Sequence, residues 1–207
     1  AYDIGMITGI ETNGVLSFKP AFSARREEAA AMLVRVYERY TSQVDWLHGF
    51  YAFSSYSQID LTAQMDAVSL GWARLEYDSA AGARINSTTA NGNEWVIPSQ
   101  PELATDYFDA HGTAYNLNIY ADCTGSVTLA DGTTTSVVEA VLADGDSRSQ
   151  AGAAIAAAAG GYAGVTIDFE GLKGETVRAA YPLFLSALRE ALSPEQTLYV
   201  CVQPDTW

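Results

Sequence analysis

The clearest hydrophobic pattern in the chain covers residues 162–170, directly after a Gly-Gly pair. The segment is short, carries several β-branched and aromatic residues and follows a turn signal, which together predict a buried strand. Alternate side chains of a strand share a face. One predicted face is apolar and the other is polar: Val165, Ile167 and Phe169 against Thr166, Asp168 and Glu170. Carboxylates at the end of a buried strand are costly, so they indicate a functional site.

Around this strand the chain alternates between strand-like and helix-like segments. Further strands are predicted at 46–54, 70–77, 115–121 and 197–202. Helices are predicted at 61–68, 102–110, 135–142, 147–159 and 177–192. After the strand at 70–77, Asn91-Gly92 indicates a hairpin with 95–97 as its returning strand. This alternation predicts an α/β fold with a parallel sheet covered by helices.

The first part of the chain, 1–43, has a different pattern and is predicted to form a separate small unit. Residues 1–6 are predicted to end a helix, and turn residues then indicate a loop. Ser23 is the predicted N-cap of a helix that ends near Tyr40. The apolar positions of this helix recur at helical spacing: Ala29, Leu33, Val36 and Tyr40. The second unit is predicted to span 44–207.

The amino-acid composition limits the kinds of molecule that the protein is expected to bind. The 207 residues include 25 acidic residues and 11 Lys or Arg, a formal net charge of −14. An acidic surface repels phosphates, which argues against a nucleic-acid partner. No apolar run is long enough to span a bilayer. Cys123 and Cys201 are predicted to be small buried hydrophobic residues rather than a bridge. His48 and His111 have no metal-ligand spacing to other residues, so the sequence predicts no metal site and no cofactor.

The strand at 162–170 resembles the signature strand of glycoside hydrolase family 18, the chitinase-like family, written D-G-x-D-x-D-x-E. Gly164, Asp168 and Glu170 match this pattern, whereas Ala163 and Thr166 stand where the family usually has Asp. The resemblance covers about 46–207 and implies a partial (β/α)8 TIM barrel with about five of its eight strands. The chain is therefore expected to be a fragment clipped at both ends.

The resemblance implies a mechanism in which the substrate takes part. Glu170 would be the general acid that protonates the glycosidic oxygen, and Asp168 would orient the 2-acetamido group that acts as nucleophile. A neighbouring carboxylate favours the protonated acid, and Thr166 could donate a hydrogen bond to Asp168. The substrate would be an N-acetylglucosamine polymer, either chitin or peptidoglycan. Because the family's acetamide-binding Tyr and subsite-floor Trp come from later strands, the fragment itself is expected to be inactive.

Several aromatic residues near predicted strand ends could stack on sugar rings: Tyr51, Trp72, Tyr120 and Trp207. Each could equally fill the core, because large aromatic side chains dominate protein interiors. Segments 71–77, 93–98 and 198–204 resemble the bacterial branch that cleaves peptidoglycan or spore cortex. The alternative is a catalytically silent family 18-like lectin. Retention of Glu170 argues against that alternative, and Ala163 and Thr166 argue mildly for it.

The first unit resembles the later part of an S-layer homology module. The matching segments are 5–9, 18–20 and 25–33. In that family a T-R-A-E-like tetrapeptide opens the helix and helps to bind secondary cell-wall polysaccharide, which implies contacts from Arg26 and Glu28. A solvated first turn with mixed charges explains these two residues equally well. The two resemblances together predict an extracellular protein of a bacterial cell wall or cell surface.

Overall fold

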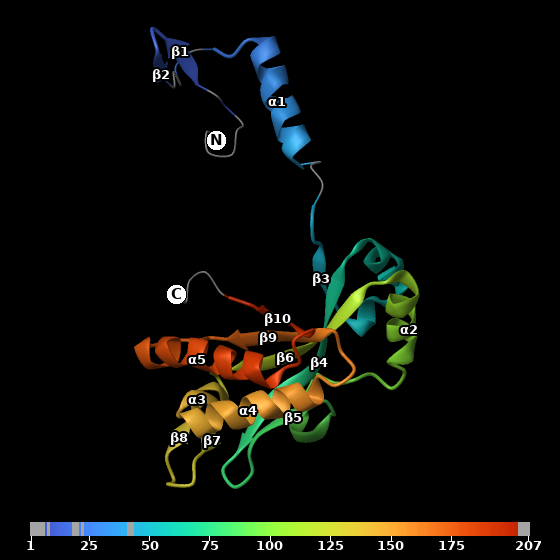
Figure 1. Cartoon of the computed structure of the whole chain (residues 1–207), viewed down its shortest axis with the longest axis vertical. Coiled ribbons are helices and arrows are strands. Elements are labelled where there is room, and N and C mark those ends of the chain that lie inside the picture. The colour runs from blue at the N-terminus through green and yellow to red at the C-terminus, as the bar shows by residue number, and fades with distance from the viewer. Residues whose placement is uncertain (1–6, 8, 18–20, 22, 41–43, 203–207) are drawn as a thin grey trace. The chain divides into compact units, whose positions relative to one another are not determined.

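The computed structural model describes residues 7, 9–17, 21, 23–40 and 44–202. The chain divides into two compact units, Ala1–Asp45 and Trp46–Trp207, drawn in Figure 1. The identification of the first unit with an S-layer homology module stays a prediction. In the described part of the chain, no helix combines the length and the apolar composition that crossing a bilayer requires.

The first unit contains a hairpin and a helix. Strands β1 (Ile10–Thr12) and β2 (Val15–Ser17) pair antiparallel. The Asn-Gly pair between them has left-handed backbone angles at both positions, with φ of 53° and 74°, as a two-residue hairpin turn requires. Helix α1 spans Arg26–Tyr40, so Arg25 directly precedes it and the predicted N-cap Ser23 lies two residues earlier than that position. The helix end predicted at 1–6 lies outside the described residues.

In its described residues, 46–202, the second unit is built on five parallel strands. They are β3 (His48–Tyr51), β4 (Ala67–Asp78), β6 (Ala114–Asp122), β9 (Gly164–Glu170) and β10 (Thr197–Val200). Their order in the sheet is β10-β9-β6-β4-β3, so each strand lies beside the next one along the chain. Strand β5 (Gly82–Asn86) adds an antiparallel partner to β4. This arrangement confirms the predicted α/β class.

The sheet curls strongly. His48 of β3 and Tyr199 of β10 lie on its two edge strands, yet their ring centroids are 4.3 Å apart in an edge-to-face contact. In a flat sheet, strands four positions apart would be separated by about 19 Å. The inward side chains of the two edges can meet only if the sheet closes toward a barrel. The unit is therefore a half-barrel, as the prediction of a partial TIM barrel requires.

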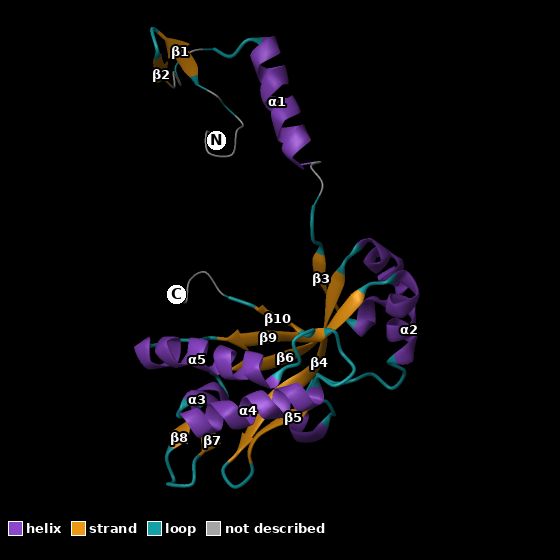
Figure 2. Cartoon of the chain, viewed as in Figure 1, coloured by secondary structure: helices purple, strands orange, loops and turns teal. Residues whose placement is uncertain are grey.

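Helices cover the outer side of this half-barrel (Figure 2). They are the 3₁₀ helix η1 (Phe53–Gln64) and the α-helices α2 (Glu102–His111), α3 (Val137–Leu142), α4 (Gly145–Ala158) and α5 (Glu175–Ala191). Each α-helix places a fully buried side chain in one continuous core: Phe108, Val141, Ile155 and Phe184. The predictions of α2 to α5 are confirmed to within a turn at each end.

The helix predicted at 61–68 is wrong. Its place is taken by η1, which begins earlier, and by the start of β4 at Ala67. A strand that is buried on both faces forms a continuous apolar run, which the sequence pattern does not separate from a helix. Ala67, Val68 and Leu70 are at most 1% exposed each, and the apolar run is interrupted only by Ser69, which is equally buried.

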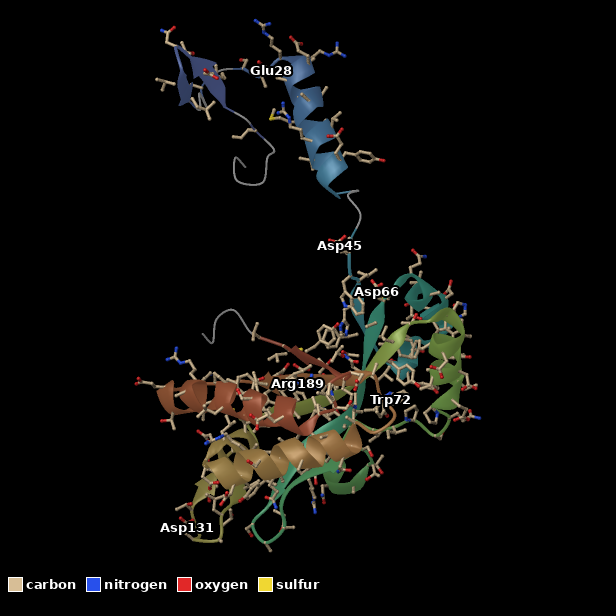
Figure 3. The ribbon with its side chains drawn as sticks, in the orientation of Figure 1. Glu28, Asp45, Asp66, Trp72, Asp131 and Arg189 are labelled. Atoms are coloured by element: carbon tan, nitrogen blue, oxygen red, sulfur yellow. The ribbon has the colours of Figure 1, made fainter. Side chains whose placement is uncertain are left out.

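The hairpin predicted at Asn91-Gly92 is also wrong. Strand β4 returns through a turn at Asp78, whose Oδ1 accepts the backbone N–H groups of Ala80 and Ala81 at 2.9 and 2.8 Å. The Asn-Gly pair instead belongs to a short 3₁₀ turn, η2 (Ala90–Gly92), with Asn91 at φ 56°. Residues 95–97 form no strand. Another hairpin, formed by β7 (Val127–Thr128) and β8 (Thr134–Thr135), carries Asp131 in its turn (Figure 3).

Gly164→Ala is expected to destabilise the second unit by about 1–3 kcal/mol, because the added methyl group overpacks a strand contact. A Cβ at this position would lie 2.6 Å from the Thr197 backbone nitrogen and closer still to its carbonyl oxygen. Both atoms belong to β10, so the two strands would have to separate. Urea unfolding measures the change. Gly160→Ala is the matched control, since its Cβ would meet only the Ala157 carbonyl, at 3.4 Å. Equal stability of the two variants would contradict the close approach of β9 and β10.

Candidate active site

The end of β9 places its polar residues on the side opposite to the helices. Phe169 packs against Tyr181 and Phe184 of α5, with ring centroids 5.9 and 5.4 Å apart. Its neighbours Asp168 and Glu170 therefore face the concave side of the sheet. Asp168 is half-buried and Glu170 is exposed. The two carboxylates lie at the carboxyl end of a parallel strand, where barrel enzymes carry their reactive groups.

Strand β6 adds a tyrosine and a third carboxylate beside this pair. Tyr120 lies opposite Asp168 and Asp122 lies opposite Glu170 in the strand register. The Tyr120 hydroxyl donates to Asp122 Oδ2 at 3.1 Å. Burial, this hydrogen bond and the nearby carboxylate charges raise the pKa of Tyr120 to about 12, so its phenol keeps its proton.

Asp122 is held in its ionised form by the loop that follows β6. Burial would raise its pKa, but hydrogen bonds from the backbone N–H groups of Gly125 and Thr124 outweigh that effect and lower the value. These bonds reach Asp122 Oδ1 at 3.1 and 2.9 Å. Sequence reasoning missed this residue. The sequence feature that could have identified Asp122 is its position directly after the predicted third strand, on the same face as Tyr120.

On the other side of Asp168 lies Cys201, directly after β10. The Cys201 backbone N–H donates to the Ile167 carbonyl at 2.9 Å, which continues the strand pairing up to this residue. Burial, followed by the charge and hydrogen bond of Asp168, raises the pKa of the Cys201 thiol to about 11. The thiol therefore stays protonated and donates to the carboxylate. Cys123 and Cys201 are both free and only half-buried, so the prediction of two buried residues holds only in part.

A buried chain of hydroxyl groups runs below the carboxylates. Thr166 Oγ1 lies 2.6 Å from Ser69 Oγ of β4, and Ser69 Oγ lies 2.8 Å from His48 Nε2 of β3. Ser69 and Thr166 are each 1% exposed. Thr166 was expected to donate to Asp168, and its observed partner is Ser69. Neither Ser69 nor His48 was predicted to belong to the site.

A cavity of about 610 Å³ adjoins the carboxylates at the ends of β4 and β6. Tyr120 and Asp122 line the cavity. Asp168 and Glu170 do not line it, but they lie opposite these two residues on the neighbouring strand. Trp95 stacks on Tyr120, with ring centroids 4.4 Å apart and planes 18° from parallel. The cavity thus has an aromatic wall next to a carboxylate, a combination suited to a polar ring with apolar faces.

The loop that carries Trp95 is fixed by a buried carboxylate, Glu76 of β4. Glu76 accepts hydrogen bonds from two arginines and two asparagines at 2.6 to 3.1 Å: Arg74, Arg84, Asn86 and Asn91. Asn93 then binds the backbone on both sides of it, including the carbonyl and the N–H of Trp95. This polar network determines where the aromatic wall lies.

The four aromatic residues predicted to contact sugar lie in different environments. Tyr120 lines the cavity. Tyr51 and Trp72 are 6% and 3% exposed and belong to the hydrophobic core, so the structure corrects their assignment to a ligand surface. Trp72 is labelled in Figure 3. Tyr51 packs edge-to-face on Phe108, with ring centroids 5.3 Å apart. Trp207 lies outside the described residues.

Arg26 and Glu28 of the first unit are both exposed. Glu28 Oε2 accepts the backbone N–H of Arg25 at 2.8 Å, so this carboxylate serves the start of helix α1. Their predicted contact with a wall polysaccharide stays a prediction.

Comparison with known proteins relates the fold to that of chitinases. No family model and no curated protein matches the chain. Among solved structures, a chitinase from Bacteroides thetaiotaomicron matches with a TM-score of 0.55 and 15% identity, over 77% of this chain and 47% of that one. A GH18 chitinase from Pseudoalteromonas aurantia matches with a TM-score of 0.51 and 15% identity, over 74% and 55%.

The chain spans about half the length of the solved structures that it matches. At this level of identity the match establishes the fold alone: the half-barrel of the second unit has the fold of the matching part of these two structures. What the chain does is a separate question, which the site residues must answer.

Proposed function

We propose that this chain belongs to a glycosidase that cleaves β-1,4 bonds of N-acetylglucosamine-containing polymers. The observation that carries the proposal is the position of Asp168 and Glu170. They lie next to each other on the concave side of a half-barrel at the carboxyl end of β9, and that half-barrel matches chitinase folds.

The proposed reaction uses the substrate's own acetamide as nucleophile. The acetamide carbonyl oxygen attacks the anomeric carbon while Glu170 gives its proton to the departing glycosidic oxygen. The bond between the anomeric carbon and that oxygen breaks, and an oxazolinium ring forms. Glu170 then takes a proton from water, whose oxygen attacks the anomeric carbon and opens the ring. The configuration at that carbon is retained.

Asp168 would bind the acetamide N–H and stabilise the positive charge that develops on the ring. Its surroundings suit this role, because the Cys201 thiol is protonated and interacts with one side of the carboxylate, and Tyr120 lies opposite it on β6. A carboxylate that accepts a hydrogen bond from this thiol is restricted in orientation. Such restriction is what positioning a reactive amide requires.

The finer features of the proposal are the substrate and the place of action. We propose a bacterial cell-wall or cell-surface enzyme that acts on peptidoglycan, spore cortex or chitin. Arg26 and Glu28 would contribute contacts to secondary cell-wall polysaccharide, because both are exposed at the first turn of α1. Release of reducing ends from chitooligosaccharides and from glycan strands by the full-length gene product tests the reaction. Absence of release from both polymers would contradict it.

A thiazoline mimic of the oxazolinium ring is expected to inhibit at least about 100-fold more tightly than the parent sugar binds, as reaction-intermediate analogues do. The prediction follows from acetamide participation alone. Inhibition constants measured against reducing-end release give the ratio. The matched control is the same sugar with a hydroxyl in place of the fused ring. Equal inhibition by the two compounds would show that the acetamide is not the nucleophile.

A carbohydrate-binding protein without catalytic activity is the second candidate. The observation in its favour is that Thr166, at a position where the related family usually has Asp, is a buried hydroxyl bonded to Ser69. The two candidate functions differ in whether bound oligosaccharide is cleaved. Binding of chitooligosaccharides by the full-length gene product, without release of reducing ends, would favour the second.

A further inference from the structure

Another pocket, of about 430 Å³, lies at the amino ends of β6 and β9. It is enclosed by the end of helix α2, the start of β6 and the turn before β9, and its lining residues are 108–109, 112–115 and 161–163. Strand β9 runs from Gly164 to Glu170, so roughly 20 Å of strand separates this pocket from the carboxylates of the candidate active site. The pocket is therefore a separate feature of the second unit.

Backbone hydrogen bonds connect the segments around the pocket. The Thr113 N–H donates to the Phe108 carbonyl at 3.0 Å, and Gly112 has a φ of 71°, so helix α2 ends there in a left-handed turn. The Ala163 N–H donates to the Tyr115 carbonyl at 2.9 Å, which joins the turn before β9 to β6. Regular structure therefore supports the pocket on both sides, and its shape exists before any ligand binds.

Three aromatic side chains line the pocket: Phe108, Tyr115 and Tyr162. The rings of Tyr115 and Tyr162 are nearly perpendicular, with planes 84° apart and centroids separated by 6.0 Å, so together they form a corner. The buried Phe108 ring lies 5.8 Å from Tyr115. Both tyrosines are partly exposed, and burial raises the pKa of each phenol, so solvent reaches two uncharged rings. The electron-rich faces of such rings attract cations.

The charge around this pocket is negative. Of the described residues that line it, Asp109 alone is charged, and this carboxylate is exposed at the end of α2. The cavity beside the candidate active site also combines an aromatic wall with carboxylates, but Arg74 and Arg84 line it as well. A cation would therefore meet two positive side chains in that cavity and none in this pocket, where a single carboxylate attracts it.

We propose that this pocket binds a small organic cation that carries an alkylated ammonium group. The cation lies against the rings of Tyr115 and Tyr162, with its charge beside the Asp109 carboxylate. An alkylated ammonium is weakly hydrated, whereas a primary ammonium is strongly hydrated and needs hydrogen-bond acceptors in place of the water that it loses. Aromatic walls next to a single carboxylate suit the first of these groups. The proposal is independent of the glycosidase reaction, and its test uses no activity.

Binding is tested by titrating the ¹⁵N-labelled chain with choline and recording ¹H–¹⁵N correlation spectra. Choline is expected to shift the amide signals of Gly112, Gly161 and Ala163 in a saturable way, and to leave those of Gly92 and Gly125, which line the other cavity, unchanged. Two matched compounds are 3,3-dimethylbutan-1-ol, in which carbon replaces the ammonium nitrogen, and ethanolamine, whose ammonium is primary. Each is expected to bind at least about tenfold more weakly than choline. No saturable shift with choline, or equal or tighter binding of either compound, would overturn the proposal.

Variants of the two kinds of wall separate charge from ring. Asp109→Asn keeps the shape of an exposed side chain and is expected to weaken choline binding about tenfold, with no change for the neutral alcohol. Glu102→Gln is the matched control, because Glu102 is exposed on the same helix but lies about 10 Å further along it and does not line the pocket.

Tyr162→Leu removes a ring and is expected to weaken choline binding about tenfold, whereas Tyr162→Phe, which keeps the ring, is expected to bind like the wild type. A melting temperature is measured for each variant. If Tyr162→Leu does not fold, Asp109→Asn decides the question. Choline affinity that the folded variants leave unchanged would overturn the proposal.

Discussion

Glu170→Gln is expected to lower kcat of the full-length gene product by about 10²- to 10⁴-fold, which is the contribution of a general acid. Gln has nearly the same size and hydrogen-bonding reach as Glu but cannot give up a proton. Glu170 is exposed at the end of β9, so the exchange disturbs no packing. Affinity for a chitooligosaccharide is therefore expected to stay nearly constant. Initial rates of reducing-end release and equilibrium binding to the same oligosaccharide measure the two quantities.

Glu195→Gln is the matched control for this experiment. Glu195 is also exposed, but it precedes β10 and so lies at the opposite end of the strands. The same chemical change there is expected to leave both rate and affinity unchanged. A Glu170→Gln enzyme that keeps most of the wild-type rate would mean that another group protonates the leaving oxygen. Asp122, opposite Glu170 on β6, would then be the next residue to exchange.

The parts of the fold that the sequence predicts are those that depend on local pattern. Strand β9 follows from strict alternation, and the alternation also identifies which face carries Asp168 and Glu170. Helix α3 begins at Val137, after the N-cap Ser136. The hydroxyl and the backbone N–H of Ser136 both bond to Glu139, a capping box that can be read from the sequence. In these elements local preference and the final fold agree.

The parts that the sequence does not predict depend on register between distant strands. The Ser69–Thr166 bond joins residues 97 positions apart, and it exists because the curl of the sheet brings β4 and β9 together over β6. The pairing of β4 with β6 also shifts between Leu70 and Ala73, a change of register that the residue pattern does not announce. Tyr120 could not be distinguished from Trp72 in advance, because the sequence does not show which strand face is covered by helices.

The buried carboxylate of Glu76 links stability to the cavity beside the site. Its side chain is 10% exposed and is paired with Arg74 at 2.6 Å and with Arg84 at 2.8 Å. Arg74 also donates to the Asn91 carbonyl at 3.0 Å, and Asn91 donates to Glu76 at 2.9 Å, so the loop before Trp95 is bound to the same network. Losing the charge would leave the two arginines without a charged partner and would weaken the hold on this loop.

Acid is expected to weaken the network in a defined range of pH. Burial would raise the pKa of Glu76, but hydrogen bonds from Arg74, Asn86, Asn91 and Arg84 outweigh it and lower the pKa from 4.5 to about 2. A pKa that is depressed in the folded state stabilises the protein above the unfolded value and ceases to do so as the pH falls through the folded value. The difference corresponds to roughly 3 kcal/mol. This stability is expected to be present above about pH 4.5 and to be lost between there and about pH 2.

Glu76→Gln is therefore expected to lower the free energy of unfolding at pH 7 by about 3–5 kcal/mol, the cost of breaking a buried ion pair from one side. Urea unfolding followed by circular dichroism measures it. Glu94→Gln is the control in the same loop; Glu94 is exposed, so its exchange is expected to change stability by less than about 0.5 kcal/mol. The gap between wild type and Glu76→Gln must also close on acidification toward pH 2, because protonation makes the two side chains alike in charge. A gap that stays constant from pH 7 to pH 3 would mean that the network stabilises the loop through shape and neutral hydrogen bonds, and that the charge of Glu76 contributes nothing.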